Sequence, residues 1–186
     1  MNIFATNFEP SVCAKEHCLV HRRKMLTEYA QIMCMCHSIW GSHTNVMYKD
    51  NKAHLKHPST LWAAESLDNY LWLNRLWKHL AFLHYDSTGR EHKSFVSLHE
   101  ALNMDHFGKI YPSFKTSMLA TGENISYRER CRGNIFFAYQ LYLSDKFDSW
   151  RTRTDKRVMI PEWDDNKVPQ WYISNTKLRE NIYDLY

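Results

Sequence analysis

The sequence predicts an all-α protein that forms a single compact domain of three long helices plus short helices and irregular loops. The chain has 186 residues, of which 44% are hydrophobic and 15% aromatic, enough to build one packed core. Only five glycines and five prolines occur, so tight turns should be few and regular elements long. Several segments also place apolar residues at helical spacing. We therefore expect residues 1–186 to form one domain.

Charge and motif content narrow the function classes. The net charge is +4, which permits a polyanionic partner without requiring one. The five cysteines include no C-x-x-C pair, which is typical of reduced thiols in a cytoplasmic protein. No apolar run approaches the roughly 18 residues of a membrane span. His17 and His21 could pair on a metal, but no third ligand accompanies them, and no phosphate-binding loop is present. We expect no metal and no cofactor.

The first half of the chain is predicted to hold short elements followed by a long helix. Residues 2–6 are expected to form an extended segment against the core. Pro10 suits the first position of a short helix over residues 10–18. A long helix is then predicted over residues 21–40. It carries an apolar stripe at helical spacing, formed by Met25, Tyr29, Ile32, Cys36 and Ile39.

A second stripe of polar residues flanks the apolar stripe of this helix. It consists of His21, Lys24, Glu28 and Gln31. A charged group beside a core is tolerated only when it is paired, hydrogen-bonded or used in function. The alternative is a solvated flank in which Lys24 and Glu28 pair across one helical turn.

A second long helix is predicted over residues 57–85. Its apolar face includes Trp62 and Tyr70 but is interrupted by Ser66 and Asn69. A buried serine is most simply explained by a hydrogen bond to the carbonyl four residues earlier. Asn69 has more hydrogen-bonding capacity to satisfy, which makes it the stronger site candidate.

A third long helix is predicted from Ser126 to about Phe147, because Ser126 and Glu129 have the spacing of a capping box. Two predicted helix N-termini are rich in cations: Arg22, Arg23 and Lys24 in one, and Arg128, Arg130 and Arg132 in the other. Cations there oppose the helix dipole, so we expect both ends to bind anions such as phosphate. The alternative is that nearby carboxylates absorb these charges.

The remaining segments are a short helix over residues 94–103 and an irregular connection over residues 104–124. Such a long connection is often functional. The tail after Trp150 interleaves basic and aromatic residues, which could contact phosphates and stack on bases. For Trp163 and Trp171 we expect a role in closing the core instead.

Taken together, these motifs resemble a family of bacteriophage proteins. The residues that carry the resemblance are Met1-Asn2-Ile3-Phe4, then His21-x-x-Lys24-Met25-x-x-Glu28-x-x-Gln31, then His57-Pro58-x-x-x-Trp62-x-x-x-Ser66-x-x-Asn69-Tyr70-x-Trp72-Leu73, and finally Ala138-Tyr139 to Lys146-Phe147 with Trp150 and Pro161-Glu162-Trp163. Members are described as related to the endonuclease V type of pyrimidine-dimer DNA glycosylase. Some are placed in phage pathways that hypermodify thymidine.

The resemblance implies an amino acid:DNA transferase. The amine of a small amino acid, such as glycine or serine, would displace the phosphate-activated group at the 5-methylene carbon of 5-hydroxymethyluracil in DNA. The implied partners are double-stranded phage DNA with modified bases and a free amino acid. No membrane is involved, and the implied location is the cytoplasm of the infected bacterial host.

The expected roles follow from this reaction. Glu28 would act as general base on the incoming amine or position it. His21, Arg22 and Lys24 would neutralise the leaving phosphate. Trp62 could stack on a flipped base. Further pocket or phosphate-binding residues are expected to be Gln31, His57, Ser66, Asn69, Tyr70, Arg128 and Arg132.

Two alternatives remain open. The first is a glycosylase/AP lyase of the endonuclease V type, which uses its N-terminal amine as nucleophile and a Glu in a His-x-x-x-Glu-Tyr-like helix, similar to Glu28-Tyr29. Asn2 departs from this pattern, because a large second residue disfavours removal of Met1, and so it favours an amine supplied by the substrate. The second alternative is a non-catalytic DNA-binding protein whose polar stripe is structural.

Overall fold

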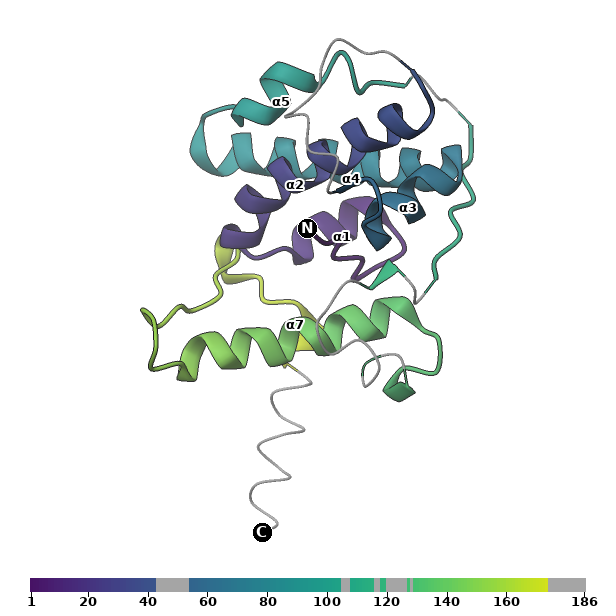
Figure 1. Cartoon of the computed structure of the whole chain (residues 1–186). Coiled ribbons are helices and arrows are strands. Elements are labelled where there is room, and N and C mark those ends of the chain that lie inside the picture. Colours follow the sequence, from purple (N-terminus) through teal and green to yellow (C-terminus); the bar gives the residue numbers. More distant parts are fainter. Residues whose placement is uncertain (43–53, 105–107, 116–117, 120–126, 128, 174–186) are drawn as a thin grey trace.

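A computed structural model describes residues 1–42, 54–104, 108–115, 118–119, 127 and 129–173. Within these residues every regular element is a helix, which confirms the predicted all-α class. With the labels of Figure 1, the elements are α1 (Pro10–Glu16), α2 (Leu19–Ile39), α3 (Pro58–Glu65), α4 (Leu67–Thr88), α5 (Lys93–Leu98), α7 (Ile135–Thr152) and the 3-10 helix η3 (Asp164–Asn166).

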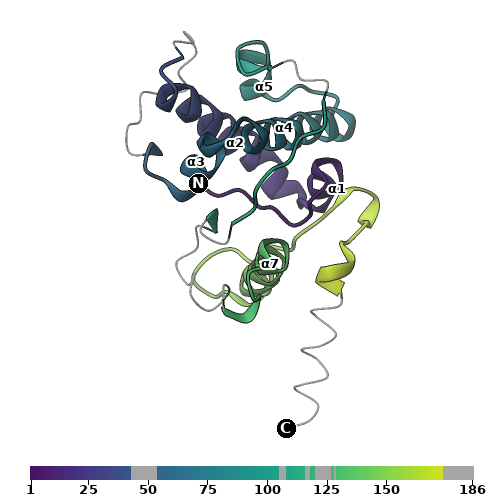
Figure 2. The same cartoon turned by 90° about the vertical axis from the view of Figure 1, so that its right-hand side faces the viewer.

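The helices form two levels with the N-terminal segment between them. Helices α2 and α4 pack together, and α1, α3 and α5 contact this central pair. Helix α7 lies on the other side of residues 1–6, as Figures 1 and 2 show from two directions. One connected hydrophobic core includes residues from both levels and from the N-terminal segment. Among the described residues, no helix combines the length and apolar character that crossing a membrane requires.

Several predicted elements are confirmed. Residues 2–6 are buried against the core outside any helix, α1 starts at Pro10, and α2 spans the predicted long helix. The segment is not fully extended, because the backbone N–H groups of Ala5 and Thr6 bond to the carbonyl oxygens two residues earlier. The predicted helix over residues 94–103 is shorter, because α5 ends at Leu98. Trp163 is buried in the core, and Trp171 is partly buried against it. All five cysteines are buried and free.

The predicted second long helix is wrong at Ser66. This residue has an extended backbone (φ −149°, ψ 154°), so α3 ends there and α4 begins. Its hydroxyl accepts a hydrogen bond from the Asn69 backbone N–H at 3.1 Å and caps α4. The Ser66 hydroxyl therefore caps a helix and is not bonded to the carbonyl four residues earlier, because serine is a preferred N-cap residue.

The predicted third long helix is interrupted. Residues 127, 129 and 130 are helical, near the predicted start, but residues 131–133 form a turn. Helix α7 begins at Ile135, and the Asn134 side chain caps it by accepting from the Phe137 backbone N–H at 3.1 Å. Arg132 (φ 48°) and Gly133 (φ 84°) form a left-handed turn just before it. Arg132 is thus an exposed turn residue and not part of the first helical turn. Ser126 and Arg128 lie outside the described residues.

Candidate functional site

The N-terminal segment connects α2 to α7. The backbone N–H of Asn2 donates to Glu28 Oε2 of α2 at 3.2 Å, and the Asn2 Oδ1 accepts from the Tyr139 hydroxyl of α7 at 2.7 Å. Two residues later, the Phe4 backbone N–H donates to the Tyr29 hydroxyl at 3.1 Å. These bonds place the Glu28 carboxylate where three segments of the chain meet.

Glu28 is a nearly buried carboxylate with two partners. Its side chain is 14% exposed, and Oε1 lies 3.1 Å from Nζ of Lys24, which is 61% exposed. The ion pair between Lys24 and Glu28, which we expected if this stripe were only a solvated flank, is therefore present. The second carboxylate oxygen, however, binds the N-terminal segment. Glu28 is thus held in place from two directions, as a positioned acid–base group must be.

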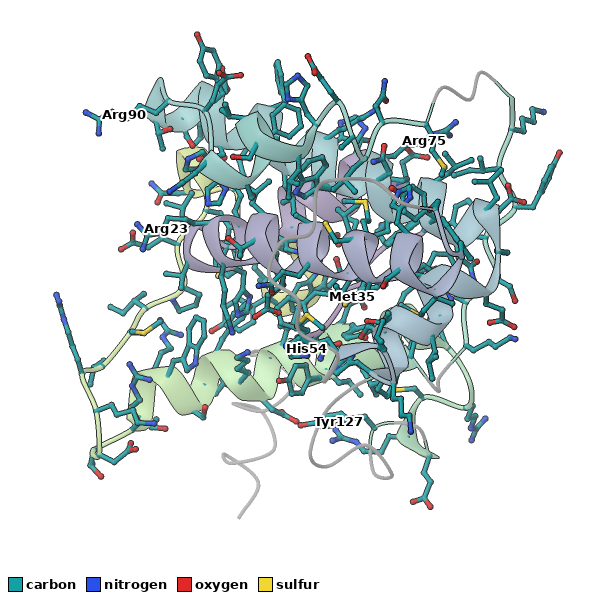
Figure 3. The ribbon with its side chains drawn as sticks, turned by 45° about the horizontal axis from the view of Figure 1, so that its top comes forward. Arg23, Met35, His54, Arg75, Arg90 and Tyr127 are labelled. Carbon is teal, nitrogen blue, oxygen red and sulfur yellow. The ribbon has the colours of Figure 1, made fainter. Side chains whose placement is uncertain are left out.

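His57, the residue just before α3, lies near the N-terminal segment. Its Nδ1 accepts from the Ser59 backbone N–H at 3.2 Å. Burial lowers its pKa, and the positive charge at Met1 lowers it further, whereas Glu28 and a hydrogen bond to the Met1 backbone raise it. These interactions put His57 beside Met1 and within electrostatic range of Glu28. Figure 3 labels His54, whose charge also acts on His57.

Lys146 is a functional candidate that the sequence reasoning missed. Its Nζ lies over three aromatic rings, at 5.2 Å from the centroid of Phe4, 5.6 Å from Tyr142 and 5.7 Å from Trp150. Burial lowers its pKa and Lys24 lowers it further, whereas Glu28 opposes the change. A signal was present in the sequence, since residues 142, 146 and 150 share one helical face at spacing i, i+4 and i+8.

His21 is a core residue. It is 2% exposed, and its ring packs against Phe4 (4.7 Å between centroids), Trp150 (5.0 Å) and Phe147 (5.4 Å). Within the described residues, neither ring nitrogen has a hydrogen-bond partner. Burial holds its pKa well below the usual value, so the ring is uncharged at neutral pH. This corrects the expectation that His21 neutralises a leaving phosphate.

The metal pairing considered for His17 and His21 is also corrected. His17 lies at the end of α1 and not in the helix of His21. Its Nδ1 contacts the Cys13 carbonyl oxygen and its Nε2 contacts the Tyr29 hydroxyl, both at 2.8 Å. Both ring nitrogens are therefore occupied within the protein.

Arg22 contacts α4 and η3, so its charge is used away from the candidate site. It is 2% exposed, pairs with Asp164 of η3 and donates to the Leu83 carbonyl oxygen at 3.1 Å. Together with Arg23 and the end of α4 it lines a separate hollow of about 380 Å³. In Figure 3, Arg23 points outward at the N-terminal end of α2. Arg22 therefore stabilises the contact between α2, α4 and the tail, which corrects its expected role beside Glu28.

The polar residues predicted on the second long helix are structural. Asn69 donates to the Trp62 carbonyl oxygen at 2.9 Å and accepts from the Ser113 backbone N–H at 2.8 Å. The Trp62 ring is 3% exposed, stacks on Phe114 and donates to the Ser113 carbonyl at 2.7 Å. Tyr70 donates to the Leu102 carbonyl oxygen at 3.1 Å. These residues hold Leu102, Ser113 and Phe114 in place, and Trp62 has no free face for a base.

Four side chains remain as the candidate site, which we call the Glu28 cluster: Lys24, Glu28, His57 and Lys146. No protein-family model, curated protein or solved structure matches this chain. The cluster must therefore be judged by its own chemistry. It offers one carboxylate that can accept a proton and two ammonium groups that can bind anions. Gln31, one turn beyond Glu28 on α2, is partly buried and could extend it.

Proposed function

We propose that the protein is a DNA-modifying transferase that joins a small amino acid, through its amine, to the 5-methylene carbon of phosphate-activated 5-hydroxymethyluracil. It would act on phage DNA in the cytoplasm of the infected bacterial host. The observation that carries the proposal is the Glu28 carboxylate, which lies nearly buried between the Lys24 ammonium and the Asn2 backbone N–H.

The proposed reaction needs a base and a stabilised leaving group. A free amino acid enters with a protonated amine, which must lose a proton before it can attack. Glu28 would accept that proton. As the new C–N bond forms, the C–O bond to the activating phosphate breaks, and the phosphate leaves with the bonding electrons. The ammonium group of Lys24 would offset the charge that develops on this group.

Binding to DNA is supported by charge at the surface. The chain has a net charge of +4, and Arg151, Lys156 and Arg157 are exposed at and beyond the end of α7. Cations of this kind bind DNA phosphates and make affinity depend on salt. Because the 5-methylene carbon is attached to a stacked base, the target base would be flipped out of the duplex.

The test is incubation of the protein with a DNA duplex that contains pyrophosphorylated 5-hydroxymethyluracil and with each amino acid in turn. The proposal predicts that digestion to nucleosides and mass spectrometry will show the mass of one small amino acid added to the modified base. If no amino acid is added, the proposal is wrong.

A second candidate is a DNA glycosylase/AP lyase, and the lowered pKa of the Lys146 amine near Glu28 favours it. A less basic amine is more often unprotonated and therefore nucleophilic. The Lys146 amine would attack C1′ of the sugar, and the damaged base would leave with the bonding electrons and take up a proton. Opening of the sugar ring at the C1′–O bond would then convert the attached amine into an imine. Borohydride would then trap a DNA–protein adduct in wild type but not in Lys146→Met. Absence of any adduct on dimer-containing DNA argues against this candidate.

A further inference from the structure

Lys146 is a partly buried cation without a counter-ion among the described residues. No carboxylate in that part of the chain forms an ion pair with it; Glu28 pairs with Lys24 instead. The rings of Phe4, Tyr142 and Trp150 have their centroids 5.2–5.7 Å from its ammonium group. Aromatic faces attract a cation but leave its hydrogen-bond donors unused. An ammonium in this setting can therefore bind an anion from outside.

The position of Lys146 relative to Glu28 follows from the N-terminal segment. Asn2 binds Glu28 through its backbone, and the Phe4 ring lies under the Lys146 ammonium. Two residues of chain span at most about 7 Å. The pKa of Lys146 also responds to both Lys24 and Glu28. Glu28 and Lys146 therefore contact the same short stretch of the N-terminal segment, two residues apart.

This arrangement matches the two charges of a free α-amino acid. Such a molecule carries an ammonium and a carboxylate on a single carbon atom, so its two charges are separated by only a few ångströms. The Glu28 carboxylate is suited to the ammonium, and the Lys146 ammonium is suited to the carboxylate.

We propose that Lys146 binds the carboxylate of the incoming amino acid while Glu28 receives its amine. This inference rests on the proposed transferase function. The carboxylate is then the group by which the protein distinguishes an amino acid from other amines. The surrounding rings limit water near the ammonium, which strengthens the ion pair. A carboxylate held by Lys146 also fixes the amine against Glu28, so that proton transfer and attack occur from one position.

The test compares glycine with glycinamide, which has the same amine but an uncharged amide in place of the carboxylate. The variants are Lys146→Met, Lys146→Arg, which keeps the charge, and Lys167→Met as the control. Lys167 is an exposed lysine that pairs only with Asp165 among the described residues. Thermal unfolding of each variant establishes that it is folded before KM and kcat are measured.

We expect wild type to prefer glycine over glycinamide by about tenfold or more in KM, the usual effect of losing one charged hydrogen-bonding partner. In Lys146→Met the KM for glycine should rise to that for glycinamide, while the kinetics with glycinamide change less than twofold. Lys146→Arg should recover part of the preference, and Lys167→Met should match wild type.

Other outcomes separate the proposed transferase function from the proposed role of Lys146 in binding the carboxylate. If wild type transfers both amines with equal KM, or if Lys146→Met keeps the wild-type KM for glycine, the carboxylate assignment is wrong and the transferase proposal stands. If wild type transfers neither amine, the transferase proposal fails. Titration of ¹³C-labelled glycine, followed by NMR, then decides the assignment directly: glycine binding that is lost in Lys146→Met supports the site, and absence of binding to wild type overturns it.

Discussion

Acid should destabilise the fold through His17, a buried histidine that is held uncharged. The Cys13 carbonyl can only accept a hydrogen bond, so His17 Nδ1 carries the hydrogen at this 2.8 Å contact. Its Nε2 must then accept from the Tyr29 hydroxyl at 2.8 Å, and that hydroxyl in turn accepts from the Phe4 backbone N–H at 3.1 Å. A second proton on His17 would break this chain of hydrogen bonds.

The expected loss can be calculated from the pKa. Burial lowers the pKa of His17 from 6.5 to about 4. Between these values the unfolded chain binds the proton and the folded protein does not, so stability is complete above pH 6.5 and falls as the pH drops toward 4. At pH 5 the loss from His17 alone is about 2 kcal/mol. His21, whose pKa is also lowered by burial, adds a loss of the same sign.

Urea unfolding at pH 7.5 and pH 5.0 measures this loss. The variant His17→Gln should be less stable than wild type at pH 7.5, because it loses the bonded ring, but its stability should fall by about 2 kcal/mol less on acidification. The exposed His99 provides the control, since His99→Gln should retain the wild-type response. An equal loss in wild type and His17→Gln would refute the assignment of a buried neutral His17.

Three further predictions concern the fold and are checked by denaturant unfolding. Ser66→Ala should cost about 1 kcal/mol, because it removes the cap of α4; an unchanged midpoint would contradict that role. Gly89→Ala should lower the free energy of unfolding by about 1 kcal/mol, because φ is +66° at this position. A Cβ there would meet nothing within 4 Å, so backbone strain is the only cost. A gain in stability would contradict this. Asp164→Ala should lower the free energy of unfolding by about 2 kcal/mol, because it leaves the buried Arg22 guanidinium without its anion. Arg22→Met should cost less, because the carboxylate that it leaves unpaired is partly exposed. A larger loss in Arg22→Met than in Asp164→Ala would contradict this explanation.

Local patterns predicted those parts of the fold that local interactions determine. The apolar stripe of α2 and Pro10 at the start of α1 depend on nearby residues, and both helices were predicted correctly. The break at Ser66 was missed, because apolar spacing continues across it and hides the capping serine. In the same way, the S-x-x-E pattern at Ser126 obscured the cap at Asn134, from which α7 starts.

The candidate site was predicted in part for the same reason. Glu28 and Lys24 were found because a polar stripe beside an apolar one is visible within a single helix. Lys146 becomes relevant only when α7 packs against the N-terminal segment, as in the bond between Tyr139 and Asn2, which are 137 residues apart. His21 was misjudged because its position on the helical wheel does not reveal that Phe4 and Trp150 cover it.

If Glu28 is the proton acceptor in amino-acid transfer to DNA, a substitution that removes only its basicity must slow transfer. The variant Glu28→Gln keeps an oxygen for the Asn2 N–H but cannot act as a base, and Glu65→Gln is the control because Glu65 is a half-exposed carboxylate paired with Lys115. We expect Glu28→Gln to bind the activated duplex as wild type does, while its rate of amino-acid addition falls by about 10²-fold or more. Glu65→Gln should transfer at the wild-type rate. Addition at the wild-type rate by folded, DNA-binding Glu28→Gln would contradict this role of Glu28.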